Sequence, residues 1–374
     1  MSLTSRAAVL DGVRGKFSIT KATVPDPQPG SFILKQDLCG ICGTDVHVYQ
    51  GHMPVPNPTV LGHEIVGTIA KLGDGVTVDS TGRPVKEGDL IGLKPGIANH
   101  DDFFGSIAHQ PSLSPGFGAY GFAAPNLTKQ MPLEVSGGYA SYQLVVPQAK
   151  FYKMNADPVA SSILEPLAVG LHAAGKARYA IGDTVVIQGA GPIGLMCLVG
   201  AKELGAHKTI VIGAPADRLE FARELGADMT IDITEITDQV ERAQMVREAS
   251  THGYGADIVI EATGVLAALP EGFGLLRRGG QYVTCGHFTN VGDVPLNPFA
   301  HFTFKQISLF GVWASAHEHF VQARTLIERN AYPFAKFVSH QIPLERVADG
   351  IAAMSGSYMI DGKPIRKVAI KAEG

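Results

Sequence analysis

The sequence is poor in three features that would each indicate a class of protein. Only four cysteines occur in 374 residues, two of them three positions apart and two isolated, which is not the pattern of a disulfide framework. No apolar run approaches the roughly 18 residues of a membrane-spanning helix, and Asp11 interrupts the first apolar stretch before it reaches signal-peptide length. The formal charge is −4 and the pI is near 6.3, which argues against nucleic acid or an anionic membrane as the main partner. We therefore expect a soluble, cytoplasmic protein.

Reactive side chains are concentrated in one stretch, CGICGTDVHVYQGHMPVPNPTVLGHE, which runs from Cys39 to Glu64. Catalytic zinc sites take three protein ligands from Cys, His and carboxylate groups and leave a fourth position open. Cys42 and His63 can supply a sulfur and an imidazole from two loops, and Asp45 and Glu64 can orient or supplement them. A redox CxxC pair, or simply two buried cysteines, remains the alternative interpretation of Cys39 and Cys42.

The first 160 residues have the pattern of a β-rich domain. Short alternating stretches are separated by turns that contain proline and glycine, as in a small barrel or sandwich. Strands are expected at 7–10, 32–37, 64–72, 89–93 and 140–146. The segment 79–87 is interpreted as a hairpin insertion that forms a solvated loop.

The pattern changes at Thr184, where strands and helices begin to alternate. The buried-strand run TVVIQ leads directly into GAGPIG and a helix that ends near Gly205. Further strands at 209–212, at 257–264 and after Gly280 predict βαβ units and a doubly wound parallel sheet, an α/β Rossmann domain. From about residue 309 the structure becomes mixed again, and the final strand is expected to complete the first domain. The predicted domains are thus 1–165 with 309–374, and 166–308.

The GAGPIG segment is a candidate dinucleotide site. GxGxxG is a weak signal alone and a strong one between a buried strand and a helix. Gly189 permits the tight turn, Gly191 lets a pyrophosphate approach the backbone, and Gly194 lets the helix pack on the strand. The free N–H groups of the following helix, which starts at Pro192 and Ile193, favour phosphate. A purely structural glycine-rich turn is the alternative.

Two motifs resemble those of a known family. CGICGTDVH and LGHEIVG closely resemble the zinc signatures of the medium-chain alcohol and polyol dehydrogenases, and the resemblance extends over nearly the whole chain. It implies a partly open barrel that carries zinc, and NAD(P)-linked interconversion of a secondary alcohol (cyclic, bulky or polyol) and its ketone. It also implies a homodimer or homotetramer. The alternatives are a zinc-free enoyl or quinone reductase of the same fold and a non-catalytic dinucleotide-binding protein.

The resemblance also assigns the metal ligands. Cys42 is the expected thiolate ligand, His63 the imidazole ligand and Glu165 the third ligand, while Glu64 beside the metal can exchange with water. Glu165 can alternatively be the acidic residue of a helix N-terminus. Cys39 occupies a position where the family accepts many residues, so it is expected to be buried without a role.

Two further residues resemble the family's proton path. Thr44 corresponds to the relay hydroxyl and His47 to the imidazole that passes the proton to solvent, a task suited to a side chain with an ordinary pKa near 6.5. A surface His47 without a function is the alternative. Reductases of this fold lack the set of Cys42, His63 and Glu165, and a non-catalytic protein would have no reason to keep Thr44 and His47 beside it.

The cofactor preference is indicated only weakly. NAD-specific proteins usually place an acid about 20 residues after the glycine motif, and in the family's pattern that position, five before Arg218, is Gly213. Residues 214–216 contain no basic side chain that would bind a 2′-phosphate, and Asp217 mildly disfavours one. NAD is therefore favoured, with NADP open. Arg218, and Thr263 at the end of strand 257–264, are further expected cofactor contacts.

The second, structural zinc of many relatives is not expected here, which leaves one catalytic zinc per subunit. Residues 94–138 correspond to its lobe and contain no cysteine. A substitute metal site at four residues of this region is less favoured than a solvated loop: His100, Asp101, Asp102 and His109. Aromatic residues could wall a pocket for a bulky or cyclic alcohol, or pack on their own domain: Phe103, Phe104, Phe117, Tyr120, Phe122 and Trp313.

Overall fold

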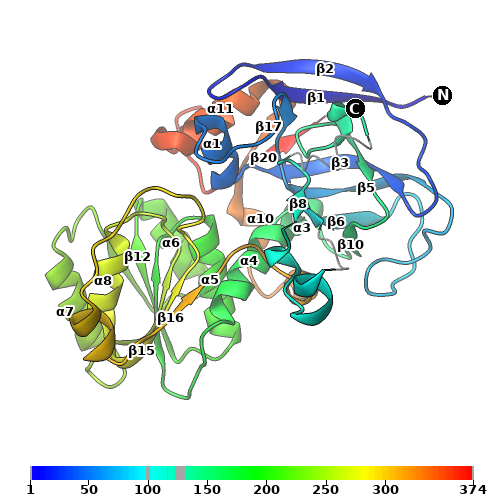
Figure 1. The fold of residues 1–374 in the computed structure, drawn as a ribbon. Coiled ribbons are helices and arrows are strands. Elements are labelled where there is room, and N and C mark those ends of the chain that lie inside the picture. The colour runs from blue at the N-terminus through cyan, green and yellow to red at the C-terminus, as the bar shows by residue number, and fades with distance from the viewer. Residues whose placement is uncertain (1, 98–101, 116, 123–130, 373–374) are drawn as a thin grey trace. The chain divides into compact units, whose positions relative to one another are not determined.

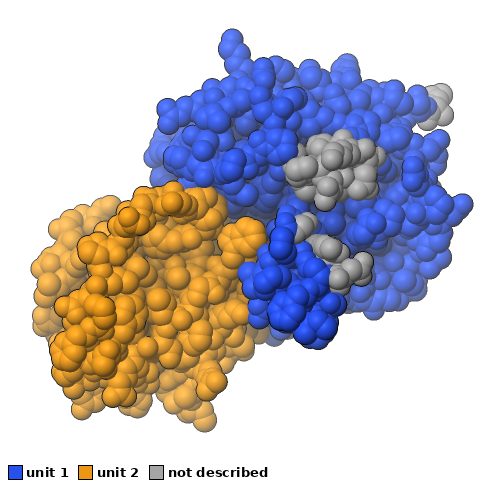
Figure 2. All heavy atoms as spheres, viewed as in Figure 1, with its two compact units in different colours: residues 1–165, 316–374 blue, residues 166–315 orange. Residues whose placement is uncertain are grey.

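The computed structural model describes residues 2–97, 102–115, 117–122 and 131–372. It has two compact units, Met1–Glu165 with Ala316–Gly374, and Pro166–Ser315 (Figures 1 and 2). The predicted boundary at residue 309 falls inside β16 (Ser308–Gly311), which pairs with β15 (Leu276–Thr284), so the second unit extends past that boundary. Within the described ranges, no helix is long and apolar enough to cross a membrane.

The second unit is built on a six-stranded parallel sheet with the order β13-β12-β11-β14-β15-β16. Counted along the chain this is 3-2-1-4-5-6, the order of a doubly wound Rossmann domain, which confirms the predicted fold class. The central strands β11 and β14 are buried along their whole length, and apolar residues form the middle of each. The other strands are β11 (Thr184–Gln188), β12 (Lys208–Gly213), β13 (Met229–Asp232) and β14 (Ala256–Glu261). Helices flank the sheet (Figure 1): α5 (Pro192–Glu203), α6 (Ala216–Glu224), α7 (Gln239–Ala249), α8 (Ala268–Leu275) and the turn η4 (Pro298–Thr303).

The first unit is β-rich, as predicted, and joins both ends of the chain. Its main sheet has the order β10-β6-β5-β3-β20-β17, with β9 also paired to β3, and a second sheet has the order β2-β1-β4. The C-terminal strand β20 pairs with β3, Ile370 facing Cys39, so the end of the chain completes this unit. The strands are β1 (Thr4–Leu10), β2 (Phe17–Thr23), β3 (Phe32–Gly40), β4 (Thr59–Val60), β5 (Glu64–Leu72), β6 (Leu90–Lys94), β7 (Gly96–Ile97), β8 (Gly118–Ala119), β9 (Tyr142–Val145), β10 (Lys150–Lys153), β17 (Val338–Pro343), β18 (Met359–Ile360), β19 (Lys363–Pro364) and β20 (Lys367–Lys371).

Short helices connect these strands. They are α1 (Gly43–Gln50), η1 (Phe103–Ile107), η2 (Pro111–Leu113), η3 (Leu133–Val135), α3 (Pro158–Ser161), α9 (His317–Arg329), α10 (Phe334–Phe337), η5 (Leu344–Arg346), α11 (Val347–Ala352) and η6 (Ala353–Ser357). Helix α4 (Leu164–Ala174) begins in the first unit and continues into the second. Apolar residues of the strands form the core between them.

The segment 79–87 is held more firmly than the sequence suggested. Its first residue, Asp79, is buried, and its carboxylate accepts hydrogen bonds from the Lys153 backbone N–H (2.9 Å) and from Arg324 of α9 (3.0 Å). Arg83 donates two hydrogen bonds to Glu328 of the same helix, at 2.6 and 2.9 Å. The expectation of a solvated loop was therefore wrong for Asp79. Its carboxylate is buried, and a buried charge has to be paired with other groups of the protein.

Candidate active site

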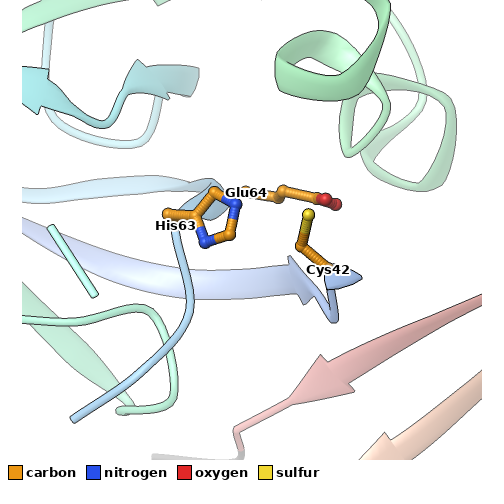
Figure 3. Close-up of side chains that lie close together, drawn as sticks. All are labelled: Cys42, His63 and Glu64. Atoms are coloured by element: carbon orange, nitrogen blue, oxygen red, sulfur yellow. The ribbon is translucent and has the colours of Figure 1, made fainter. Parts of the chain in front are cut away.

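Three side chains predicted as metal ligands lie together at the ends of β3 and β5. The ligand atoms of Cys42, His63 and Glu64 are all within 4.8 Å of one another (Figure 3). The sheet register explains this, because Gly40 at the end of β3 pairs with Glu64 at the start of β5, so the two loops meet. A sulfur, an imidazole nitrogen and a carboxylate oxygen are donors that zinc accepts in catalytic sites.

Asp45 lies behind this cluster and is fully buried. Its carboxylate accepts hydrogen bonds from the Cys42 N–H (2.9 Å), the Tyr139 hydroxyl (2.9 Å) and the Gly62 N–H (3.3 Å), and it lies 3.6 Å from Nδ1 of His63. Although burial disfavours a charged imidazole, the Asp45 carboxylate raises the pKa of His63 well above its ordinary value. Nδ1 of His63 has no hydrogen-bond partner among the described residues, but the nearby carboxylate favours a proton on that nitrogen, which leaves Nε2 for a metal.

The two carboxylate oxygens of Glu64 have different surroundings. Its Oε1 accepts a hydrogen bond from the buried Lys367 ammonium at 2.5 Å, and Lys367 also donates to the Ile41 carbonyl at 2.9 Å. Its Oε2 is buried and has no hydrogen-bond partner among the described residues. Because an unsatisfied buried carboxylate oxygen is costly, a cation at the cluster fits the residues present. A side chain at Gly40 would collide with this oxygen, so the glycine makes room for it.

Glu165, the third ligand expected from the family pattern, does not join the close group. It lies in the first turn of α4, and in the part of the chain that the structure describes the group of mutually close donors ends at Cys42, His63 and Glu64. Burial raises the pKa of Glu165 to about 7, with the charge of His63 opposing and that of Glu64 adding to the rise. Its ligand role stays a proposal.

The predicted proton path follows helix α1, which Cys42 caps. Thr44 is in the first turn, and its hydroxyl lies 3.6 Å from the Cys42 sulfur. His47 lies on the next turn and is half-buried. Burial and the neighbouring His52 lower the pKa of His47. The sequence reasoning did not single out His52, whose imidazole contacts that of His47.

The glycine loop of the second unit has the geometry of a phosphate cradle. Gly189 has φ +108°, a conformation that favours glycine. A Cβ on Gly194 would lie 1.9 Å from the Gly189 carbonyl, so α5 can pack on β11 only with glycine there. A Cβ on Gly191, by contrast, would meet no described atom within 4 Å. The loop and the first residues of α5, Pro192 and Ile193, therefore leave an open approach to the helix N-terminus.

The remaining predicted cofactor residues lie on both sides of β11: Gly213 and Thr263 at or just after the carboxyl ends of β12 and β14, and Arg218 on helix α6. Gly213 ends β12, and a Cβ there would lie 2.6 Å from the Ala190 backbone nitrogen. Arg218 on α6 is buried. Thr263 donates its N–H (2.6 Å) and its hydroxyl (2.8 Å) to the buried carboxylate of Glu261. Glu261 was missed, although an acid that ends the apolar run DIVIE was a usable signal.

The region between β6 and β9 is only partly described. His100 and Asp101 lie outside the described residues. Asp102 accepts a hydrogen bond from the Gly105 N–H at 2.8 Å and so caps a turn. His109, the last of the four residues weighed for a substitute metal site, has the left-handed φ of +53°.

The aromatic residues of this region do not act as one group. Tyr120 is fully buried, and its hydroxyl donates to the Leu144 carbonyl at 2.9 Å, so of the two alternatives this residue packs on its own domain. The hydroxyl needs a buried acceptor, and the core supplies one. Phe122 lies against His63, with 4.6 Å between ring centroids, and Phe103 is exposed. Phe122 therefore lies beside a candidate metal ligand.

Known families match both halves of the chain. Residues 28–156 match the alcohol dehydrogenase GroES-like domain, and residues 192–329 match the zinc-binding dehydrogenase family. The chain is 31% identical to 5-exo-hydroxycamphor dehydrogenase of Pseudomonas putida, over 96% of this chain and 98% of that one. It is 30% identical to sorbitol dehydrogenase of Ovis aries, over 90% and 89% of the two chains.

Solved structures agree with these matches. An alcohol dehydrogenase from Thermotoga maritima superposes with a TM-score of 0.89 and 31% identity, over 99% of this chain and 100% of that one. A zinc-binding dehydrogenase from Sinorhizobium meliloti bound to NADP gives 0.84 at 28% identity, over 99% of both chains. The chain belongs to the zinc-binding medium-chain alcohol and polyol dehydrogenase family. It is an NAD(P)-dependent enzyme, and small alcohols and ketones are the substrates of its family.

Proposed function

We propose that this enzyme oxidises a cyclic, bulky or polyol secondary alcohol to its ketone and passes a hydride to NAD. The observation that carries the proposal is the close group of Cys42, His63 and Glu64, in a chain similar to dehydrogenases named for hydroxycamphor and sorbitol. The first name denotes a cyclic alcohol and the second a polyol. Phe122 beside His63 supports a partly aromatic substrate environment.

The metal part of the proposal is one catalytic zinc and no structural zinc. The Cys42 sulfur, the His63 imidazole and Glu64 would hold it, with Glu165 adding to or replacing Glu64. Zinc supplies a Lewis acid that polarises the alcohol and lowers its pKa. Asp45 would keep the His63 ring oriented, and Lys367 holds one oxygen of Glu64 while the other has no hydrogen-bond partner among the described residues.

The chain's own residues would then move the proton. Thr44 lies beside the Cys42 sulfur, so its hydroxyl can accept the proton of an alcohol bound there. His47, which is partly exposed at the end of the same helix, would release that proton to solvent. Burial and His52 lower the pKa of His47, which favours the neutral imidazole that can accept a proton.

The cofactor part of the proposal is NAD bound along the Rossmann sheet. The loop Gly189–Gly194 and the N-terminus of α5 would hold the pyrophosphate, and Arg218 and Thr263 would lie along the remainder of the cofactor. No side chain can be added at Gly213 without displacing Ala190, so the family's usual carboxylate position is closed here. The preference for NAD rests on the absence of basic residues at 214–216 and on Asp217.

We further propose that the enzyme is a homodimer or homotetramer. β16 is an edge strand of its sheet, and its Leu309 is 44% exposed. Phe299 and Phe304, which precede it, are 64% and 51% exposed. Exposed apolar residues beside an open sheet edge favour pairing with a second copy. Light scattering should give a dimer or tetramer for the native protein and a smaller species for Leu309→Lys, and a native monomer would overturn the proposal.

The decisive experiment compares the variants Cys42→Ala and Cys39→Ala. Cys39 is the matched control, because it is a neighbouring thiol that is fully buried in β3. Zinc content, cofactor binding and turnover would be measured with a panel of cyclic, acyclic and polyol secondary alcohols, with NAD and NADP in parallel. Cys42→Ala should lose zinc and turnover but still bind cofactor, whereas Cys39→Ala should keep all three. Full turnover by Cys42→Ala would contradict the zinc assignment.

A further inference from the structure

Two histidines of helix α1 and its C-terminal turn face each other. Nδ1 of His47 lies 3.1 Å from Nδ1 of His52, and the ring centroids are 5.3 Å apart. His47 is half-buried and His52 is exposed, so solvent ions can reach the pair. The three-residue group at Cys42 does not include either histidine.

The backbone itself imposes this contact. Helix α1 ends at Gly51, which has φ +83°, with its N–H bonded to the Val48 carbonyl at 3.0 Å and the His52 N–H bonded to the His47 carbonyl at 2.9 Å. These are the two hydrogen bonds of a Schellman motif. In that motif the side chains in the positions of His47 and His52 contact each other, and the contact is usually apolar. Here two imidazoles occupy these positions, so a pair of nitrogen donors is preorganised.

The spacing of the two nitrogens suits a metal ion. Imidazole binds zinc at about 2.0–2.1 Å, so two nitrogens on adjacent coordination positions lie about 3.0–3.4 Å apart. The observed 3.1 Å fits this range. The pair also lies at the C-terminal end of a helix, where the backbone dipole favours a cation.

We propose that His47 and His52 form a second metal site, separate from the Cys42 cluster, for a borderline transition-metal ion such as Zn²⁺, Ni²⁺ or Cu²⁺. Imidazole suits these ions. Binding moves the hydrogen that the two Nδ1 atoms share to the far nitrogen of its ring, so both Nδ1 lone pairs can face the ion without net loss of a proton. Water completes the coordination.

The site has a consequence for catalysis that rests on the proposed function. A metal ion on Nδ1 of His47 removes that nitrogen from proton transfer, and its positive charge opposes protonation of the ring. The ion therefore inhibits the enzyme without displacing the catalytic zinc. The site itself stands on the geometry of the histidine pair and does not depend on that role.

Ni²⁺ is a suitable probe, because it binds imidazole and is distinguishable from the zinc already held. Untagged, zinc-loaded enzyme is titrated with Ni²⁺ by calorimetry, and zinc content is measured afterwards. His52→Gln is the test variant, and His207→Gln, an exposed histidine of the second unit, is the matched control. Native protein and His207→Gln should bind one Ni²⁺ with the zinc retained, and His52→Gln should bind it at least about tenfold more weakly, a change of about 1.4 kcal/mol.

Equal Ni²⁺ binding in all three proteins, or loss of zinc as nickel binds, would overturn the site. Turnover is assayed in parallel, and Ni²⁺ should inhibit the native enzyme and His207→Gln but not His52→Gln. Nickel bound at the pair without inhibition would overturn the catalytic consequence and leave the site intact. If the enzyme turned over no alcohol at all, the proposed function would fail, and the calorimetry would still decide the site.

Discussion

Replacing Asp45 with asparagine tests the metal centre more sharply than removing a ligand. One carboxylate oxygen accepts the Cys42 N–H and the Tyr139 hydroxyl, and the other faces the Gly62 N–H and Nδ1 of His63. An asparagine carbonyl can replace the first oxygen, but its NH₂ then faces Gly62 and His63. His63 would accept from that NH₂ at Nδ1 and carry its own proton on Nε2, the nitrogen needed by the metal.

Two magnitudes follow for Asp45→Asn. Loss of an orienting partner of a metal-bound histidine weakens metal binding by about 10–100-fold. The Gly62 N–H loses a charged acceptor, which should lower the free energy of unfolding of the zinc-free protein by about 1.5–3 kcal/mol. Zinc affinity is measured by competition with a chelator and stability by denaturant titration. Asp37→Asn is the control, because Asp37 accepts from Thr68 at 2.7 Å on β3 and faces no metal ligand. An Asp45→Asn enzyme that is destabilised but binds zinc as tightly as the native one would refute the reasoning.

Three other substitutions test the ion pair of Glu64, the hydrogen bonds of Asp79 and the space around Gly213. Lys367→Met leaves the buried carboxylate of Glu64 without its cation. The free energy of unfolding of the zinc-free protein should fall by about 3–5 kcal/mol, and that of the zinc-loaded protein by less. Thermal melts of the two forms measure the difference. Burial opposes the charge of Asp79, but its hydrogen bonds hold the pKa of this carboxyl below the ordinary value. This stabilisation is complete above the unfolded-state pKa of about 3.9 and declines as pH falls through the folded pKa, so acid titrations of stability should fall less steeply for Asp79→Asn. Gly213→Asp should weaken the binding of NAD and NADP alike, because the new side chain would collide with Ala190. Fluorescence titration measures both affinities, and a selective gain in NAD affinity would contradict this prediction.

Local sequence patterns were sufficient to predict the fold of the Rossmann unit. The run at 184–188 is β11 over the same residues, and each glycine of the following loop has the environment that its position in the motif requires. Buried parallel strands are long apolar runs, and their boundaries are visible in the sequence. The upstream candidate ligands could also be predicted from one stretch of sequence, because Cys42, His63 and Glu64 lie where strand β3 ends and its antiparallel partner β5 begins.

Contacts between distant segments were not visible in the same way. Lys367 is 303 residues from Glu64, and nothing in the final strand distinguishes it from an ordinary surface lysine. Tyr120 resembled its aromatic neighbours in the sequence, but it fills the core because its hydroxyl reaches the Leu144 carbonyl. The carboxylate of Asp79 is likewise matched by Arg324, 245 residues away. Polar residues that are buried by long-range pairing carry no periodic signal.

The buried pair of Glu64 and Lys367 is better explained by its effect on the metal cluster than by stability. Replacing a buried ion pair with apolar residues of similar volume is often neutral or stabilising, because desolvation offsets the attraction. Both residues are almost inaccessible, so this argument applies to them in full. What an apolar pair could not do is hold one oxygen of Glu64 and direct the other toward Cys42 and His63. The lysine comes from β20, beside β3 in the sheet, so the last strand of the chain has to return to the first unit to complete the site.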